Sequence, residues 1–253
     1  MKKKHFILLA MFAIPSLLMM SCKEPEPEPD PEPETEMLKD YDGNVYTAVK
    51  IGKQCWMVEN LKTTHYADGT SIGNGGDTPS NNPRYYYPGN DSVNKGTFGL
   101  LYNWAAVMNG AESSDANPSK VQGICPKGWH VPSDAEWTEL TDYVSSKPEF
   151  VSGSNVENIG KALASKEEWA PNASANTIGN NPSTNNATGF CAVPAGGFLG
   201  EPGGGFGAYG YYWTATRESN TGSYSRDFYY DHAGVYKITY SKNFGFSVRC
   251  LKD

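Results

Sequence analysis

The histidines are the residues in this sequence whose type could bind a metal ion, if their spacing brought them together. Beyond His5 they are His65, His130 and His232, which lie far apart along the chain. None stands in a His-x-x-x-His or His-x-Glu spacing, so the sequence indicates no zinc site. We expect neither a metal nor a cofactor.

Covalent catalysis is not indicated by the sequence either. Gly69-Thr70-Ser71-Ile72-Gly73 has the Gly-x-Ser-x-Gly pattern, but it lies in a long polar stretch and not at the strand-to-helix turn that exposes a hydrolase nucleophile, so no nucleophile elbow is indicated. A pair of carboxylates of the glycosidase kind stays open, because nothing in the sequence singles out one Asp or Glu from the rest. We therefore predict no catalytic residue.

Aromatic side chains offer a different chemistry, the binding of a ligand rather than its conversion. They make up 13% of the chain, and 16 residues are tyrosine. Tyr and Trp present flat faces with a polar atom at low entropic cost, which suits sugar rings and protein anchors. The alternative is that most of them fill the core of a sheet. The candidate ligand-binding residues are Tyr85, Tyr86, Tyr209, Tyr211, Tyr212 and Trp213, with Arg217 and Asp227 as polar neighbours.

A helix after Pro132 is the element around which the rest of the chain is expected to pack. Ser133 followed by Glu136 forms a capping box, in which each side chain accepts from the backbone N–H of the other residue. Helical spacing then places three apolar residues on one face, and these are Trp137, Leu140 and Val144.

A second helix is predicted over residues 98–108, and a short one over 159–164. In the first, four residues share one face and Asn109-Gly110 provides a C-cap. Residues 172–189 are rich in Asn, Ser, Thr and Gly and should form a long loop. The four residues on the shared face are Leu101, Trp104, Ala105 and Met108.

The remaining elements are predicted to be short strands. Residues 45–51 and 55–58 form a hairpin that reverses at Gly52-Lys53, with Trp56 in the core. In the last third of the chain, alternating aromatic and polar residues separated by glycine-rich turns indicate an antiparallel sheet. Its expected strands are residues 190–197, 210–216, 223–230 and 234–238, followed by a closing strand around Phe246.

The N-terminus reads as an export signal followed by a tether. Residues 1–21 combine three lysines with an apolar stretch too short to span a bilayer comfortably, as in a signal peptide. Ser21-Cys22 resembles a bacterial lipobox, so Cys22 is the candidate lipidation site. Ordinary cleavage, with Cys22 as a spare thiol, is the alternative. Residues 22–37 alternate Pro with Glu or Asp and should form an extended acidic tether.

The charge of the chain argues against nucleic acid as a partner. The formal net charge is -7, and the domain that follows the tether has no basic stripe. Residues 38–253 form one segment of a length that a single aromatic-rich core can support.

Four motifs occur in the same order as in one bacterial family. They are residues 56–62, 101–106, 125–137 and 245–250. The chain resembles the Fibrobacter succinogenes major paralogous domain over roughly residues 38–253. That domain is found on secreted and surface proteins of the Bacteroidetes and Fibrobacter lineages, and its members are mostly of unknown function.

A more distant resemblance joins the 132–137 helix start and the Gly-Phe-x-x-Arg ending to the formylglycine-generating enzyme family. It implies a C-type-lectin-like α+β fold of short antiparallel strands, two main helices and long loops. The enzymatic role is not carried over, because that family uses a close pair of thiols near its C-terminus and this chain has only Cys250 there. The lectin calcium-sugar motif is also missing, since Glu201-Pro202 is followed by Gly. Whether a structural calcium binds stays open.

The resemblance also implies a disulfide between Cys125 and Cys250. Four cysteines remain after Cys22, which allow three pairings. The bridge from the helix to the last strand is the one found in C-type-lectin-like domains. This leaves Cys55 with Cys191, two positions that are commonly not cysteine in the family. Four free buried thiols are the alternative.

Together these features predict an outer-membrane lipoprotein, exposed at the cell surface. The acidic residues soon after Cys22 look like the signal that sends Bacteroidetes lipoproteins to the outer face. We expect its domain to act in recognition or adhesion, without catalysis, by binding a glycan or a protein. The alternatives are an enzyme related to the formylglycine-generating fold that acts on a surface polymer, and a structural component of a surface assembly.

Overall fold

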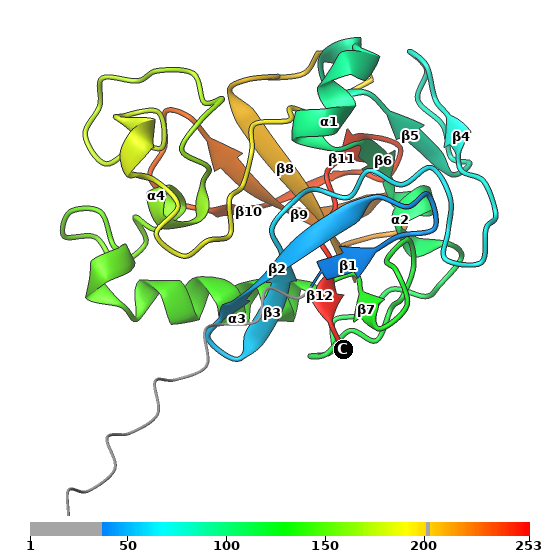
Figure 1. Ribbon diagram of the computed structural model, residues 1–253, viewed down its shortest axis with the longest axis horizontal. Coiled ribbons are helices and arrows are strands. Elements are labelled where there is room, and N and C mark those ends of the chain that lie inside the picture. Colours follow the sequence, from blue (N-terminus) through cyan, green and yellow to red (C-terminus); the bar gives the residue numbers. More distant parts are fainter. Residues whose placement is uncertain (1–36, 201–202) are drawn as a thin grey trace, which may run out of the picture. The chain divides into compact units, whose positions relative to one another are not determined.

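The computed structural model describes residues 37–200 and 203–253, shown in Figure 1. Within this part the domain is mixed α+β, with mostly antiparallel sheets and few short helices. The expected signal peptide, the lipidation site Cys22, the tether up to residue 36 and Glu201-Pro202 lie outside the described residues. No helix among the described residues is long and apolar enough to cross a membrane.

The first sheet joins the N-terminal hairpin to the last strand of the domain. Its five strands run in the order β1-β2-β3-β12-β7, with every pair antiparallel. The predicted hairpin is present, and its turn contains Gly52 at a φ of +62°. A Cβ at this position would lie 2.9 Å from the Tyr143 ring, so the turn requires glycine. The strands are β1 (Met37–Lys39), β2 (Val45–Ile51), β3 (Gln54–Met57), β7 (Trp129–His130) and β12 (Leu251–Lys252).

The second sheet has four short strands and corrects the helix predicted over 98–108. The segment contains the end of helix α1, then the strand β6, and then helix α2. Gly99 at a φ of +78° ends α1, and the next residues pair with β5 and β11. Asn103 then caps α2, because its side chain accepts from the Ala106 N–H, and Asn109 in the left-handed region ends α2 as predicted. The elements are β4 (Gly73–Asn74), β5 (Arg84–Tyr86), α1 (Lys95–Phe98), β6 (Leu101–Asn103), α2 (Trp104–Met108) and β11 (Gly245–Phe246).

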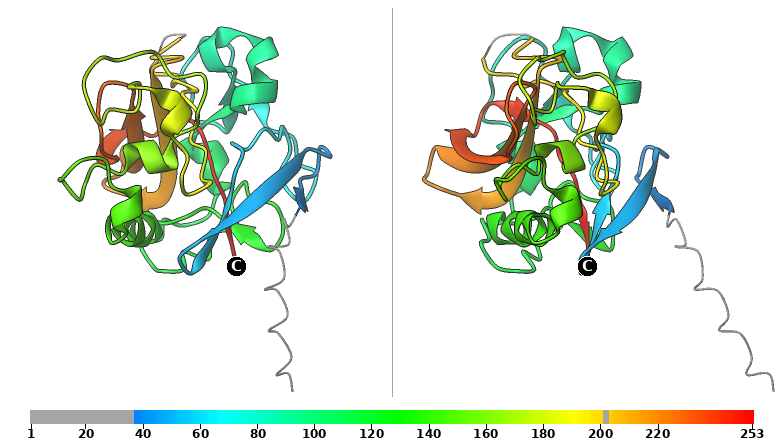
Figure 2. Two further views of the ribbon diagram at one scale, coloured as in Figure 1. Left: turned by 60° about the vertical axis from the view of Figure 1, so that its left-hand side comes forward. Right: turned by 90° about the vertical axis from the view of Figure 1, so that its left-hand side faces the viewer.

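The third sheet consists of three longer antiparallel strands in the order β10-β9-β8. These are β8 (Tyr209–Arg217), β9 (Gly222–Tyr229) and β10 (Tyr236–Ser241), close to the predicted bounds. The strand predicted over 190–197 is wrong, because that segment makes only single bridges, at Ala192, Gly196 and Gly197. Cys191 has a φ of +60°, which interrupts an extended run. Figure 2 shows β9 and β10 on the side of the domain away from the β2–β3 hairpin.

Helix α3 (Asp134–Ser145) starts as the sequence predicts. The Ser133 hydroxyl accepts from the Glu136 N–H at 3.2 Å, and the Glu136 carboxylate accepts from the Ser133 N–H at 2.9 Å. Its apolar face, Trp137, Leu140 and Val144, is buried. The short helix predicted over 159–164 is α4 (Gly160–Leu163). Four 3-10 turns complete the described elements, at Pro88–Asn90, Ser92–Asn94, Pro148–Phe150 and Pro182–Thr184.

Two large apolar clusters hold these elements together. The first core lies around the Cys125–Cys250 disulfide and includes Trp213 and Phe246. The second core lies under α3, where the Trp137 ring centroid is 4.8 Å from that of Trp56 and 5.6 Å from that of Phe190. Side chains alternate across a strand, so β8 contributes Tyr211, Trp213 and Ala215 to the first core and Tyr212 to the second.

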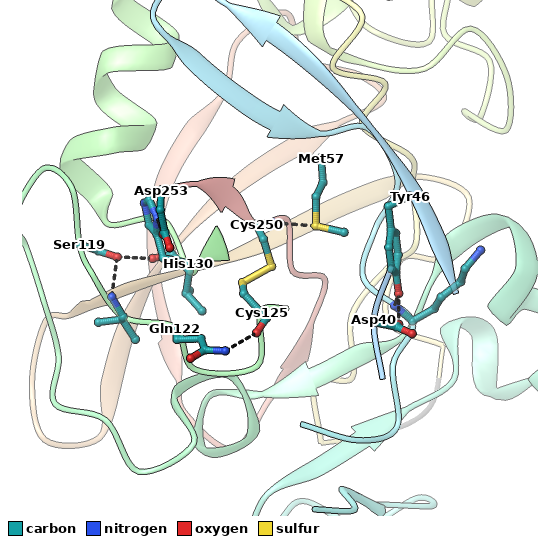
Figure 3. Close-up of a disulfide and its surroundings, with 12 residues drawn as sticks. Asp40, Tyr46, Met57, Ser119, Gln122, Cys125, His130, Cys250 and Asp253 are labelled. Carbon is teal, nitrogen blue, oxygen red and sulfur yellow. Dashed lines mark hydrogen bonds and ion pairs between the residues drawn. A yellow bond between two sulfur atoms is a disulfide. The ribbon is translucent and has the colours of Figure 1, made fainter. Parts of the chain in front are cut away.

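The disulfide between Cys125 and Cys250 is present, as the resemblance implied. The two Cα atoms are 5.9 Å apart, and both residues are fully buried. Figure 3 shows the bridge beside Met57, whose sulfur accepts from the Cys250 N–H. The bridge ties the entrance of α3 to the segment just before β12.

The expected Cys55–Cys191 disulfide is wrong, since neither cysteine is disulfide-bonded in the structure. Cys55 packs against the first core, whereas its neighbour Trp56 lies in the second core with Phe190. Adjacent side chains on a strand point to opposite faces. Cys55 therefore points away from the region where Cys191 follows Phe190.

A buried histidine links α3 to the end of the chain described here. His130 is 3% exposed, and its two ring nitrogens lie 2.8 Å from the Glu136 carboxylate and 2.7 Å from the Asp253 carboxylate. Figure 3 shows His130 beside Asp253. Burial by itself lowers the pKa of His130, but its hydrogen bonds to Glu136 and Asp253 and their negative charges raise it, and the result is a raised pKa.

We therefore expect part of the stability of this domain to be lost as the pH rises. A histidine with a raised pKa in the folded state stabilises the fold fully below its unfolded pKa of about 6.5, and this contribution disappears as the pH passes the folded value. Denaturant unfolding of the wild type and His130→Gln between about pH 5 and pH 9 measures it. The stability difference between the two should shrink with rising pH. A difference that stays constant over this range would contradict the expectation.

Candidate functional site

The structure distributes the candidate aromatic residues over several places. Tyr86, Tyr212 and Trp213 are 2% exposed or less. Trp213 packs in the first core, Tyr212 in the second, and Tyr86 in a smaller apolar cluster with Phe198. Tyr85 is half-buried on β5, beside the buried Tyr86. The candidates that share a partly exposed face lie elsewhere, on the third sheet.

Three of the candidates meet on one face of the β8–β9–β10 sheet. In the strand register, Tyr211 lies opposite Asp227, and Asp227 lies opposite Tyr236. Two residues further along the two strands, on the same face, Tyr209 lies opposite Tyr229. We call this surface the tyrosine face, and it consists of Tyr209, Tyr211, Tyr229, Tyr236 and Tyr240, with Asp227 beneath them.

The rings of the tyrosine face pack edge to face and leave part of their surface open. The Tyr209 and Tyr229 centroids are 5.2 Å apart at 88°, and those of Tyr211 and Tyr240 are 5.7 Å apart at 80°. Tyr211 is buried, Tyr209, Tyr229 and Tyr240 are half-buried, and Tyr236 is 36% exposed. The face thus passes from the first core at β8 to solvent at β10.

Asp227 holds the hydroxyl groups of Tyr229 and Tyr240 from below. It is fully buried, and its carboxylate accepts from the Ser225 hydroxyl at 2.6 Å and from the Tyr229 hydroxyl at 2.8 Å. Burial raises the pKa of Asp227 to about 6, against the opposite effect of hydrogen bonds from Ser225, Tyr229 and Tyr240. Burial and the charge of Asp227 also raise the pKa of Tyr240 to about 12, so this hydroxyl keeps its proton at neutral pH.

This arrangement suits binding. Aromatic rings that are already held in place lose little side-chain freedom when a ligand contacts them. Because Asp227 is fully buried, it positions the Tyr229 and Tyr240 hydroxyls and does not itself reach a ligand. Among residues 37–200 and 203–253, no three His, Cys, Asp or Glu side chains gather closely enough to hold a metal ion.

Arg217, the other polar candidate, lies apart from the tyrosine face. It ends β8 and is exposed, opposite Ser223. The carboxylate that interacts with an arginine of this sheet is Asp134, which lies 2.7 Å from Arg226 and also 2.7 Å from Lys237. These contacts hold the start of α3 against β9 and β10.

Tyr229, Tyr236 and Tyr240 belong to the face but were missed in the sequence. The alternation of residues 223–230 also places aromatic residues on the opposite side of the strand, namely Tyr224, Phe228 and Tyr230, with Arg226 among them. The signal that could have found Tyr229 is its spacing of two residues from Asp227, which places both on one side of a strand. Tyr236 and Tyr240 can be placed on this face only from the pairing register between β9 and β10, which cannot be read from the sequence.

A comparison with protein families shows to which family this chain belongs. The model of the Fibrobacter succinogenes major domain matches residues 49–252. The chain belongs to this family. The match includes α3, both cysteines of the disulfide and all three strands of the tyrosine face, so these are parts of a Fibrobacter succinogenes major domain. Neither the curated proteins nor the solved structures contain a match to this chain.

Proposed function

We propose that this Fibrobacter succinogenes major domain recognises a glycan through the tyrosine face, without catalysis. The observation that carries the proposal is a row of preset tyrosine rings that reaches solvent at Tyr236, over a buried carboxylate. A sugar ring has apolar C–H faces and hydroxyl edges. Rings with hydroxyl groups can match both, through packing against the ring and hydrogen bonds at its edge.

The proposal places the domain at the cell surface, anchored in the outer membrane by a lipid on Cys22. The buried Cys125–Cys250 disulfide supports a location outside the cytoplasm, since disulfides persist in oxidising compartments. The C-type-lectin-like fold belongs to the same proposal. It is supported by the bridge from the entrance of α3 to the last strand of the domain.

Binding of the purified full chain to an array of oligosaccharides and polysaccharides tests the proposal. For a glycan that binds, Tyr236→Ala should raise the Kd about tenfold, the value of one ring contact of about 1.4 kcal/mol. Tyr236→Phe should retain most of the affinity, because it keeps the ring. Tyr41→Ala is the matched control, since Tyr41 is 60% exposed and lies outside the tyrosine face.

The other outcomes decide against the proposal. Equal Kd values for Tyr236→Ala and Tyr41→Ala would remove the tyrosine face as the binding site. Formation of a product from the glycan, abolished by replacement of a single carboxylate that reaches the surface, would establish the enzyme instead. Intact cells should bind the same glycan and lose this binding after external protease treatment, whereas binding only after lysis would place the domain inside the cell.

A further inference from the structure

A cavity of about 530 Å³ lies between segments that are far apart in the sequence. Helix α2 contributes Trp104 and Met108, the loop before β5 contributes Asn81, and the turn between β8 and β9 contributes Asn220. The segment after β10 closes it with Lys242 and Asn243. Its volume is within the range of small-molecule sites in proteins, about 300–1,000 Å³. None of the tyrosines of the tyrosine face lines it.

Trp104 distinguishes this cavity from the interior of the domain. The other five tryptophans of the chain are buried, and Trp104 is half-buried. Its indole N–H donates to the Thr214 carbonyl at 3.0 Å, and its backbone N–H donates to the Lys242 carbonyl at 2.9 Å. The indole is thus fixed at the wall of the cavity before any ligand arrives.

The polar side chains around Trp104 are neutral amides and hydroxyls, apart from Lys242. Asn81, Asn220 and Asn243 line the cavity, and a carboxamide can both donate and accept hydrogen bonds. A sugar hydroxyl also does both, whereas a phosphate or carboxylate would require cationic donors. Of these three residues, Asn81 and Asn220 are exposed, so their side chains can turn toward a ligand.

The charge at this site is small and already engaged. Lys242 is the cationic residue at the cavity, and no acidic side chain lines it among the described residues. Its ammonium group donates to the Ser219 and Asn220 carbonyls at 2.9 and 3.1 Å and lies 4.4 Å from the centroid of the Trp104 ring. With these partners it has little capacity left to neutralise an anion.

From this combination we infer that the cavity is a second binding site, for a neutral saccharide of one or two rings that packs beside Trp104 and bonds to Asn81 and Asn220. The inference does not rest on the tyrosine face, because the two sites share no residue. A chain with both sites could hold one polysaccharide at two points or two different glycans.

Titration of the full chain with maltose, cellobiose and N,N′-diacetylchitobiose tests this inference. Isothermal titration and tryptophan fluorescence should both show saturable binding of at least one of them, and Trp104→Ala should weaken it about tenfold or more. Since Trp104 also packs against the first core, the variant Asn81→Ala/Asn220→Ala is the second test. It removes two exposed amides and should weaken binding while leaving the unfolding midpoint unchanged.

Two further probes separate this site from the alternatives. Tyr236→Ala should leave disaccharide binding unchanged, and a loss in that variant would place the ligand on the tyrosine face and overturn the inference. Cellobiouronic acid, an acidic disaccharide, should bind more weakly than cellobiose, and equal binding would contradict a neutral site. The inference is also overturned if no disaccharide binds at millimolar concentration, or if binding survives in both cavity variants. Either result leaves the tyrosine face to be judged by its own variants.

Discussion

Replacing Arg249 by methionine should lower the free energy of unfolding by about 3–5 kcal/mol. Arg249 is 1% exposed, and its guanidinium donates to the Asn60 side-chain oxygen at 2.9 Å and to the Cys191 carbonyl at 2.7 Å. The same group also donates to the Phe190 and Met57 carbonyls. Methionine keeps the length of the stem but leaves these buried oxygens without a donor, at about 1–3 kcal/mol for each unsatisfied group.

The partners of Arg249 explain why an arginine stands near the end of the domain. They are neutral oxygens, and the guanidinium carbon also lies 4.6 Å from the ring centroid of Phe190 and 5.5 Å from that of Tyr212. Its planar group presents five N–H donors in a fixed fork to acceptors on several sides, whereas a lysine ammonium is a compact group with three donors. Arg249 thus joins the 56–62 motif to the segment that follows α4, and it is the last residue of the Gly-Phe-x-x-Arg ending.

Urea unfolding of Arg249→Met measures this loss, with Arg217→Met as the matched control. Arg217 is exposed at the end of β8, so its replacement should change the free energy of unfolding by no more than about 0.5 kcal/mol. Domains of this kind are stable by about 5–15 kcal/mol, so the Arg249 variant should unfold at a clearly lower urea concentration. Equal midpoints for the two variants would show that Arg249 does not hold the two segments together.

Removing the disulfide should have the second largest effect, a loss of about 4 kcal/mol. Cys125 and Cys250 are 125 residues apart, so the bridge closes a long loop and restricts the unfolded chain strongly. The variant Cys125→Ala/Cys250→Ala removes the link and leaves two small cavities in the first core. Both terms favour unfolding.

Denaturant unfolding with and without reductant measures this effect in the wild type and the double variant. Reductant should lower the midpoint of the wild type and leave the double variant unchanged. Cys191→Ser is the control, because Cys191 is not disulfide-bonded and the variant should respond to reductant as the wild type does. A wild-type midpoint that reductant does not change would contradict a stabilising role for the bridge.

The local signals in the sequence predicted the helix α3 and its surroundings well. The capping box at Ser133 and Glu136 and the helical spacing after it depend on neighbouring residues, so the sequence alone contains them. The helix predicted over 98–108 failed for the opposite reason. Leu101, Trp104 and Met108 have helical spacing, but the backbone of Leu101–Asn103 pairs with strands from distant segments, and this non-local pairing overrides the local pattern.

The candidate site was predicted only in part, for a similar physical reason. Tyr209, Tyr211 and Asp227 were among the candidates and do share a face. Tyr236 joins them through the pairing register of β10 with β9. The geometry of the connecting turn sets that register, and the amino-acid composition does not reveal it. The Trp104 cavity is still further from prediction, because its walls come from four segments separated by up to about 160 residues.

The central claim, that the tyrosine face contacts a glycan, is tested most directly by nuclear magnetic resonance of the full chain with isotope-labelled tyrosines. The tightest oligosaccharide found in the array serves as the titrant. The ring resonances of Tyr209 and Tyr236 should shift saturably with one common Kd, while that of Tyr41 stays unchanged. Saturable binding that leaves Tyr209 and Tyr236 unshifted would contradict the claim.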